Sequence, residues 1–348
     1  MVFHRSDFLF KLAWDPLRVE LDEYLTRLSR SRYGTADQVT AQKAVRFLQQ
    51  AVYDNTDISH ARHQKRPFIT SFTRRIVPNG RIIPLMDKLE QFIGTLATLP
   101  DRQKDGNWFI GRDLYDAVRQ YIAEYFNMHL NRLFYVFVTR AAAADLVKAR
   151  EEFDLHASVL DFLLGVLEEM VRHNPVMYLE RYVDMYGGQP HDSYFKNPED
   201  YPDFRAFLRD NGSTFALCMG NQLPDYPSSD WYELLRWYYR PRVNAGVIYL
   251  RTLFDDLFRT DNRKIDDELK EIYMRIERKF CTEGYEITGG HLGGPGPQWR
   301  PAETAFQTIR SDARVYAALE EIPEGFFTGS YIDLFGNANR GDAEAENK

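Results

Sequence analysis

The stretch RDLYDAVRQYIAEYF, residues 112–126, decides the fold class of this chain. Its apolar side chains recur at steps of three and four residues, and they are Leu114, Val118, Tyr121, Ile122, Tyr125 and Phe126. Arg119, Gln120 and Glu124 fall on the opposite face. Because this is the period of an α-helix with one buried face, the stretch predicts a long amphipathic helix.

The same period returns in the next segment of the chain. Its apolar positions are Leu155, Val159, Phe162, Leu163, Val166, Leu167 and Met170, whereas Glu168 and Glu169 point away from them. We expect a turn near residues 148–154, because a short connection makes two consecutive helices antiparallel neighbours.

Shorter amphipathic helices are expected over 20–31, 37–53, 84–98, 202–210 and 261–280. Residues 68–84 differ, since β-branched and aromatic side chains flank Asn79-Gly80, a favoured hairpin turn. The sequence therefore predicts an all-α protein, a multi-helix bundle with long antiparallel helices, and leaves one small hairpin over 68–84 open.

The later part of the chain contains a proline and a change of composition. Residues 231–258 form one helical pattern, in which the Pro241 ring would collide with the carbonyl four residues back, so a kink or a break is expected there. Beyond Gly284 the chain is rich in glycine and proline. We predict a helical domain over 1–284, a loop and C-terminal extension packed on it over 285–338, and a disordered tail over 339–348.

Composition excludes several classes of partner. The 348 residues are 44% hydrophobic and carry a net charge of −7, so no general basic field attracts a nucleic acid or an anionic membrane. Residues 1–13 have neither the apolar region of a signal peptide nor the length of a membrane span, so a cytoplasmic protein is expected if this is the complete product. Cys218 and Cys281 are interpreted as free buried thiols.

No motif predicts a catalytic centre, a metal site or a cofactor. Asp255-Asp256 is similar to the magnesium motif of terpene cyclases but lacks that family's second motif, so a solvated acidic face is the better interpretation. His60 and His63 share a helical face without a third ligand at a matching interval. The glycine run over 289–296 has no Lys-Ser/Thr after it and is expected to be a connector.

Several short blocks, taken in order, resemble the helical domain of the α-N-acetylglucosaminidases, glycoside hydrolase family 89. They are Leu12-Ala13-Trp14, Arg32-Tyr33-Gly34, Ala51-Val52-Tyr53, Arg66-Pro67, the run over 113–120, and a run over 220–242 that contains Asp225-Tyr226, Trp231 and Tyr238-Tyr239-Arg240-Pro241-Arg242. The last block is the most specific. The resemblance extends over about residues 12–256.

Four residues in these blocks have structural interpretations of their own. Gly34 can adopt the positive φ that a helix C-cap needs. Trp231 opens the helix that Pro241 interrupts. Arg242 is placed to reach the carbonyls that the proline frees, or a buried carboxylate.

The family resemblance implies an accessory role. In family 89 a catalytic barrel precedes the helical domain and carries two glutamates that act in a retaining mechanism. The resemblance implies that this barrel, as a domain or a subunit, is absent from the chain and is its partner. It also implies that a loop over 219–226 forms one wall of the sugar pocket, where Met219, Leu223, Asp225 and Tyr226 contact a glycan that ends in N-acetylglucosamine.

Some positions depart from the family pattern. Met219 stands where the family has a tryptophan able to stack on a sugar, and Val45 and Val243 also replace tryptophans. Three hypotheses stay open: an accessory domain of a glycosidase, a freestanding module that binds a glycan or a protein, and a self-sufficient enzyme. The last needs a carboxylate pair in one pocket, which this sequence does not reveal. An uncovered 219–226 loop also predicts self-association.

Overall fold

The computed structural model describes residues 20–34, 38–53, 79–174, 177–179, 230–258, 262–282 and 299–317. In these ranges the regular structure is helical and contains no strand, which confirms the predicted all-α class. The helices are α2 (Leu21–Tyr33), α3 (Gln38–Leu48), α4 (Asn79–Ala97), α5 (Asp101–Gly106), α6 (Trp108–Thr139), α7 (Leu146–Arg172), α10 (Tyr232–Leu234), α11 (Arg240–Thr252), α12 (Asn262–Thr282), α13 (Trp299–Ser311) and α14 (Ala313–Ala317). None of them is long and apolar enough to cross a membrane.

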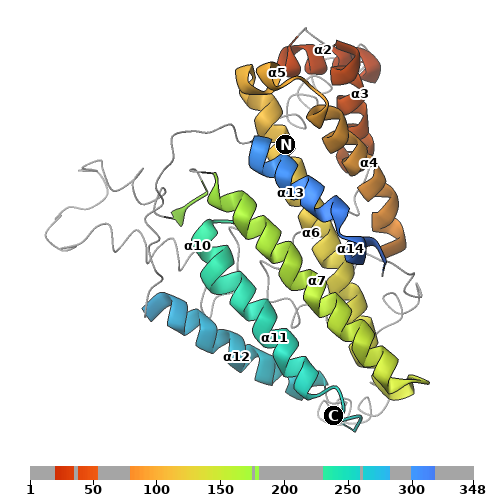
Figure 1. The fold of residues 1–348 in the computed structure, drawn as a ribbon, viewed down its shortest axis with the longest axis vertical. Helices are drawn as coiled ribbons and strands as arrows, with labels where there is room; N and C mark the ends of the chain where they lie inside the picture. The colour runs from red at the N-terminus through yellow and green to blue at the C-terminus, as the bar shows by residue number, and fades with distance from the viewer. Residues whose placement is uncertain are drawn as a thin grey trace, which may run out of the picture.

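The long helices α6 and α7 form the centre of the bundle (Figure 1). On one side α4 packs against α6, and α3 and α2 follow outward. On the other side α11 packs against α7 and carries α12. Helix α13 lies along both α6 and α7, so segments far apart in sequence meet there (Figure 1).

Helix α6 is buried around most of its circumference. Its large side chains Tyr121, Phe126 and Phe134 are at most 1% exposed. A helix that is apolar on one face only would leave the other face in water. Here α4, α7 and α13 surround α6, so its Glu124 and Asn127 are buried as well.

The turn between α6 and α7 lies earlier than predicted. Residues 148–154 are inside α7, and the connection spans residues 140–145. Asp145 caps α7 by accepting hydrogen bonds from the backbone N–H groups of Val147 and Lys148, both at 3.1 Å. Arg140 donates to the carbonyl oxygens of Phe137 at 2.6 Å and Phe254 at 3.1 Å. These side-chain contacts, rather than apolar periodicity, end one helix and begin the next.

The predicted hairpin turn at Asn79-Gly80 is wrong, because both residues open α4. The Asn79 side chain is buried, donates to the Met128 carbonyl at 3.3 Å and accepts from Asn131 at 2.9 Å. Contacts with α6 therefore outweigh the local turn preference of this dipeptide. Residues 68–78 of the predicted hairpin lie outside the described ranges.

Pro241 neither breaks nor ends the helix. A π-helical segment, Leu235–Tyr239, lies between α10 and α11, and the N–H of Arg240 donates to the carbonyl of Leu235, five residues back. The wider π turn accommodates a residue that cannot donate a backbone hydrogen bond. The helix that begins at Tyr232 therefore continues to Thr252, six residues short of the predicted end.

Gly34 ends α2 as predicted, with a φ of 81° and an N–H that donates to the carbonyl of Arg30 at 3.2 Å. Its ψ of −167° differs from that of a left-handed helical residue. A positive φ is nonetheless a conformation that glycine adopts without the cost of a β-carbon. The proposed domain boundaries at 284 and 338 stay predictions, although α13, inside that extension, packs on the bundle.

Candidate functional site

The predicted pocket-wall residues Met219, Leu223, Asp225 and Tyr226 lie outside the described residues. The candidate site therefore consists of the residues that flank this segment. They are Leu179 on one side and Asp230, four residues after Tyr226, on the other.

Both ends of that segment meet at one end of the bundle. The N–H of Tyr232 donates to the carbonyl of Met177 at 2.8 Å, and the rings of Tyr178 and Tyr232 lie 5.3 Å apart. The buried carboxylate of Glu233 accepts a hydrogen bond from the N–H of Leu179 at 2.9 Å. Contacts on both sides thus hold residues 177–179 against the start of α10.

An ion pair attaches this junction to α6. Asp230 is 5% exposed, and its Oδ2 accepts hydrogen bonds from Arg119 Nε at 2.9 Å and Nη2 at 2.5 Å. Burial acts to lower the pKa of Arg119, but the charge of Asp230 overrides this effect, so the net shift is upward. Trp231, half-buried, packs on the core beside this pair. This ion pair therefore joins the entry to α10 to the central helix α6.

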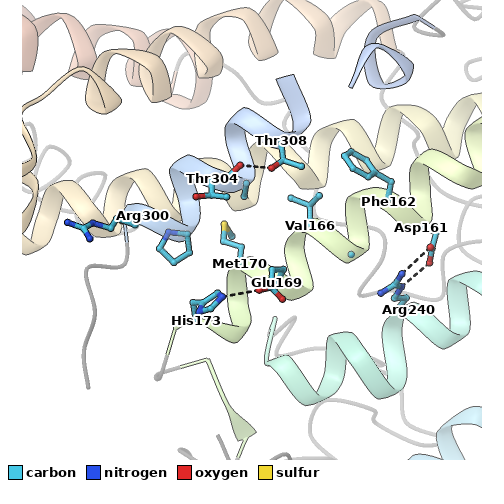
Figure 2. Close-up of a pocket in the computed structure, with 13 residues that line it drawn as sticks. Asp161, Phe162, Val166, Glu169, Met170, His173, Arg240, Arg300, Thr304 and Thr308 are labelled. Atoms are coloured by element: carbon cyan, nitrogen blue, oxygen red, sulfur yellow. Dashed lines mark hydrogen bonds and ion pairs between the residues drawn. The ribbon is translucent and has the colours of Figure 1, made fainter. Parts of the chain in front are cut away.

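A surface groove lies between α7 and α13, with a cavity volume of about 590 Å³ (Figure 2). Its lining includes Phe162, Val166 and Met170 from α7, and Pro301 and Ala305 from α13. Val166 and Met170 are directed toward α13 in this view (Figure 2). The groove is within the usual size range of ligand pockets, and its floor is apolar.

Arg240 closes one end of the groove (Figure 2). It donates two hydrogen bonds to Asp161, at 2.8 and 3.0 Å, and one to Glu168 at 3.0 Å. The hydrogen bonds from Arg240 to Asp161 are the main cause that lowers the pKa of Asp161, against the effect of burial. A β-carbon on Gly165 would lie 3.6 Å from Arg240 Nη2, so the guanidinium rests on the surface of α7 at a residue without a side chain. Arg240 thus joins α11 to α7.

The other end of the groove holds Glu169, which is 2.9 Å from His173 Nε2 and 3.4 Å from Arg172 Nη1 (Figure 2). A retaining glycosidase needs two carboxylates about 5–5.5 Å apart on either side of the scissile bond. In this groove Asp161 and Glu169 lie eight positions apart on one helix, about 12 Å along its axis. The geometry suits apolar contact and does not suit acid–base cleavage of a glycosidic bond.

Arg242 is buried beneath the π segment. Its Nη1 donates to the Tyr238 hydroxyl at 2.7 Å, and its guanidinium lies 4.1 Å from the centre of the Tyr238 ring and 5.3 Å from that of Tyr239. The structure thus gives Arg242 a cation–π and hydroxyl environment. The prediction that Arg242 reaches a carbonyl or a buried carboxylate stays a prediction, and the sequence did not indicate the Tyr238 and Tyr239 rings as its neighbours.

Two interior histidines escaped the sequence analysis. His129 and His156 lie on the apolar faces of α6 and α7, and their Nδ1 atoms are 2.9 Å apart. Their spacing of 27 residues matches no metal-site motif. The only available signal was their position between apolar neighbours three and four residues away, such as Phe126 and Leu133. Among the described residues, no group of three or more His, Cys, Asp or Glu side chains could hold a metal ion.

These features define an all-α bundle around two central helices, with a junction between residues 177–179 and α10 at one end and an apolar surface groove. No protein-family model matches the sequence, and no curated protein matches it. Solved structures do match. CpGH89 from Clostridium perfringens, in complex with its substrate GlcNAc-α-1,4-galactose, has a TM-score of 0.62 at 15% identity over 87% of this chain. A family 89 glycoside hydrolase from the same organism, in complex with PUGNAc, has a TM-score of 0.60 at 16% identity over 86% of this chain.

The chain spans about a third of the length of these enzymes, 33% and 32%. The likeness confirms that the fold is that of a segment of family 89 glycoside hydrolases, as the sequence blocks indicated. At this level of identity the fold is what the two structures share with the chain.

Proposed function

We propose that the chain is the helical accessory domain of a family 89-like glycoside hydrolase. The single observation that carries the proposal is the match of 87% of this chain to only a third of a glycosidase. In this role the chain contributes one wall of a sugar pocket, through Met219, Leu223, Asp225 and Tyr226. The reacting carboxylates belong to a catalytic domain outside these 348 residues.

The junction between residues 177–179 and α10 supports this role. A pocket wall must hold its side chains within a fraction of an ångström, so it requires support from packed elements. The Asp230–Arg119 pair and the Glu233–Leu179 contact supply that support on both sides of residues 180–229.

Hydrolysis tests the first claim. The isolated chain is expected not to cleave an aryl α-N-acetylglucosaminide above a buffer blank, because in this proposal both catalytic glutamates belong to the catalytic domain. Turnover that is abolished by replacing a carboxylate of this chain would overturn the accessory role and make the chain a self-sufficient enzyme.

Binding separates the accessory domain from the second candidate, a freestanding module that binds a glycan or a protein. Titration calorimetry with PUGNAc and with GlcNAc-α-1,4-galactose is expected to detect no tight binding to an accessory domain alone, since most of the pocket is missing. Sub-millimolar binding that Tyr226→Ala weakens, while the exposed-site control Arg112→Ala does not, would favour the freestanding module. A barrel-encoding reading frame directly upstream would favour the accessory domain.

The loop also has a predicted effect on association. An apolar surface larger than about 300–600 Å² is uncommon on a soluble monomer, so an uncovered pocket wall drives self-association or capture of the catalytic domain. Leu223→Asp is then expected to reduce association in sedimentation experiments without loss of helical circular dichroism. Unfolding of the variant would instead make Leu223 a core residue, and an unchanged oligomeric state would remove it from the interface.

A further inference from the structure

Two histidines face each other inside the bundle, and the proposed glycosidase role makes no use of them. His129 of α6 and His156 of α7 are both 0% exposed, and their Nδ1 atoms are 2.9 Å apart. On its other side, His129 Nε2 lies 3.0 Å from the carbonyl oxygen of Val315, in α14. One hydrogen-bonded chain therefore connects α7, α6 and α14.

The acceptor at the end of this chain determines both tautomers. A carbonyl oxygen can only accept, so His129 Nε2 must carry a hydrogen. Neutral His129 then has a lone pair on Nδ1, and His156 Nδ1 donates to it. The lone pair of His156 is consequently on Nε2, which lies 3.8 Å from Glu152 Oε1.

Charged groups from three elements surround the pair. Glu152 of α7 is held by Arg132 of α6, with Nε 2.5 Å from Oε1. Asp312, in the turn before α14, is 2.5 Å from Arg314 Nη2 and acts on His129 through its charge. Burial, and secondarily the neighbouring His156, lowers the pKa of His129 to about 3. Burial also lowers the pKa of His156, although Glu152 opposes this shift.

The pair can accept one proton without losing its hydrogen bonds, but not two. The first proton goes to His156 Nε2, the nitrogen with the available lone pair, and it faces Glu152. The second must go to His129 Nδ1, where it would point at the N–H of His156. That step breaks the bond between the rings and leaves two positive charges in the interior.

Helix α14 depends on these contacts. It has five residues, and a helix of this length is unstable in isolation. Besides the bond to His129, it is held by the buried Val315 side chain and by the Tyr316 hydroxyl, 2.9 Å from that of Tyr121. The Tyr316 ring also packs edge-on against Tyr125 at 5.5 Å.

We propose that His129 and His156 make α14 an acid-released latch, which detaches from α6 and α7 at low pH before the bundle unfolds. In the detached state His129 loses the Val315 carbonyl and reaches water, where the pKa of an imidazole is about 6.5. Since the attached state binds protons less readily, it is favoured above this value and weakens as the pH falls. For His129 alone, with a pKa of about 3 when buried, the opening constant is expected to rise roughly 100-fold between pH 7.5 and 4.5.

Hydrogen exchange on the full chain tests the latch. After correction for intrinsic exchange, amide protection of residues 313–317 is expected to fall about 100-fold between pH 7.5 and 4.5. Protection at the centre of α6 and α7, at Leu130 and Leu160, is expected to fall less. An unchanged protection of α14, or an equal loss in all three helices, would overturn the proposal.

Two variants separate the titration from packing. His129→Gln together with His156→Gln should make α14 protection nearly independent of pH. Tyr316→Phe, the control, should lower protection by the same factor at both pH values, since it removes a hydrogen bond without removing a group that titrates between pH 7.5 and 4.5. If the double variant does not fold, imidazole nitrogen shifts of the unmodified protein decide: a His129 that lacks a hydrogen on Nε2 at pH 7.5, or that titrates near pH 6.5, contradicts the latch.

Discussion

Asp113 of α6 accepts hydrogen bonds from both Arg32 and Tyr33 at the end of α2, through a two-point contact with the Arg32 guanidinium and a 2.7 Å bond from the Tyr33 hydroxyl. The two segments are 80 residues apart in sequence and belong to two of the blocks that carry the family resemblance. Arg119, in the same block as Asp113, joins Asp230 of the last block in the same way. Residues from three of the blocks thus tie distant helices together.

Removal of the Asp113 carboxylate is expected to be costly. In Asp113→Ala the Arg32 side chain, 13% exposed, loses its partner, and breaking such a pair costs about 3 kcal/mol of unfolding free energy. The control is Asp22→Ala. The Asp22 side chain is 74% exposed and its partner Arg46, 3.2 Å away, is 57% exposed, so this pair contributes less than about 1 kcal/mol. Urea unfolding measures both, and equal losses would contradict a special role for Asp113.

The Arg119–Asp230 pair is expected to show direct coupling. Arg119 keeps Asp116, 3.6 Å away, when Asp230 is removed, so the loss in that single variant is partly compensated. A double-mutant cycle with Arg119→Ala and Asp230→Ala should therefore give an interaction energy of about 1–3 kcal/mol. A value near zero would mean that the junction at α10 is held by Glu233 and packing alone.

Gly165 offers a test of how closely Arg240 approaches α7. A β-carbon would lie 3.6 Å from the guanidinium, which is ordinary van der Waals contact, and Gly165 is inside a helix. Gly165→Ala should therefore stabilise the protein by about 0.5–1 kcal/mol. Gly165→Met should destabilise it, since a long side chain must displace Arg240 from Asp161. The unfolding temperatures of the two variants should shift in opposite directions. If Gly165→Ala is destabilising, Arg240 lies closer to α7 than ordinary van der Waals contact allows.

The pH dependence of the Asp161–Arg240 pair has a definite sign. The hydrogen bond from Arg240 is the main cause that lowers the pKa of Asp161 below its ordinary value of 3.8. Its stabilising effect is therefore complete above about pH 4 and is lost as the pH falls through the lowered pKa. Asp161→Asn should cost up to about 1 kcal/mol at pH 6, because the pair is partly exposed. The urea midpoints of the variant and the unmodified protein should converge toward pH 2. A difference that stays constant with pH would mean that Asp161→Asn acts by changing the packing and not by removing a charge.

The sequence predicted the existence of the long helices better than their ends. The apolar steps from Leu114 to Phe126 and from Leu155 to Met170 reflect burial of one helix face. A buried face requires apolar residues at every third or fourth position, so it can be seen in the sequence. The end of α6 depends on Arg140, which donates to the carbonyl of Phe254, beyond the end of α11. The start of α7 depends on the Asp145 cap, whose partners Val147 and Lys148 are local. The apolar steps contain no information about either contact.

The candidate site divides in the same way. Met219, Leu223, Asp225 and Tyr226 rest on family resemblance and stay predictions. The groove beside Arg240 was not predicted, because it combines residues of α7, α11 and α13 that share no sequence motif. Gly34 was assigned correctly to a helix end, since the need for a positive φ is a property of one residue and its immediate neighbours.

Sequence by itself determined the all-α class, the positions of the two central helices and the likeness to a segment of family 89 glycosidases. These features follow from helical periodicity and from short blocks in a fixed order. Only the tertiary structure decided that Asn79-Gly80 opens a helix, that a π turn carries the chain past Pro241, and that His129 meets His156 beneath α14. In each case the deciding contacts join residues far apart in the chain or depend on the packing around them. The conformation therefore cannot be predicted from the neighbouring residues alone.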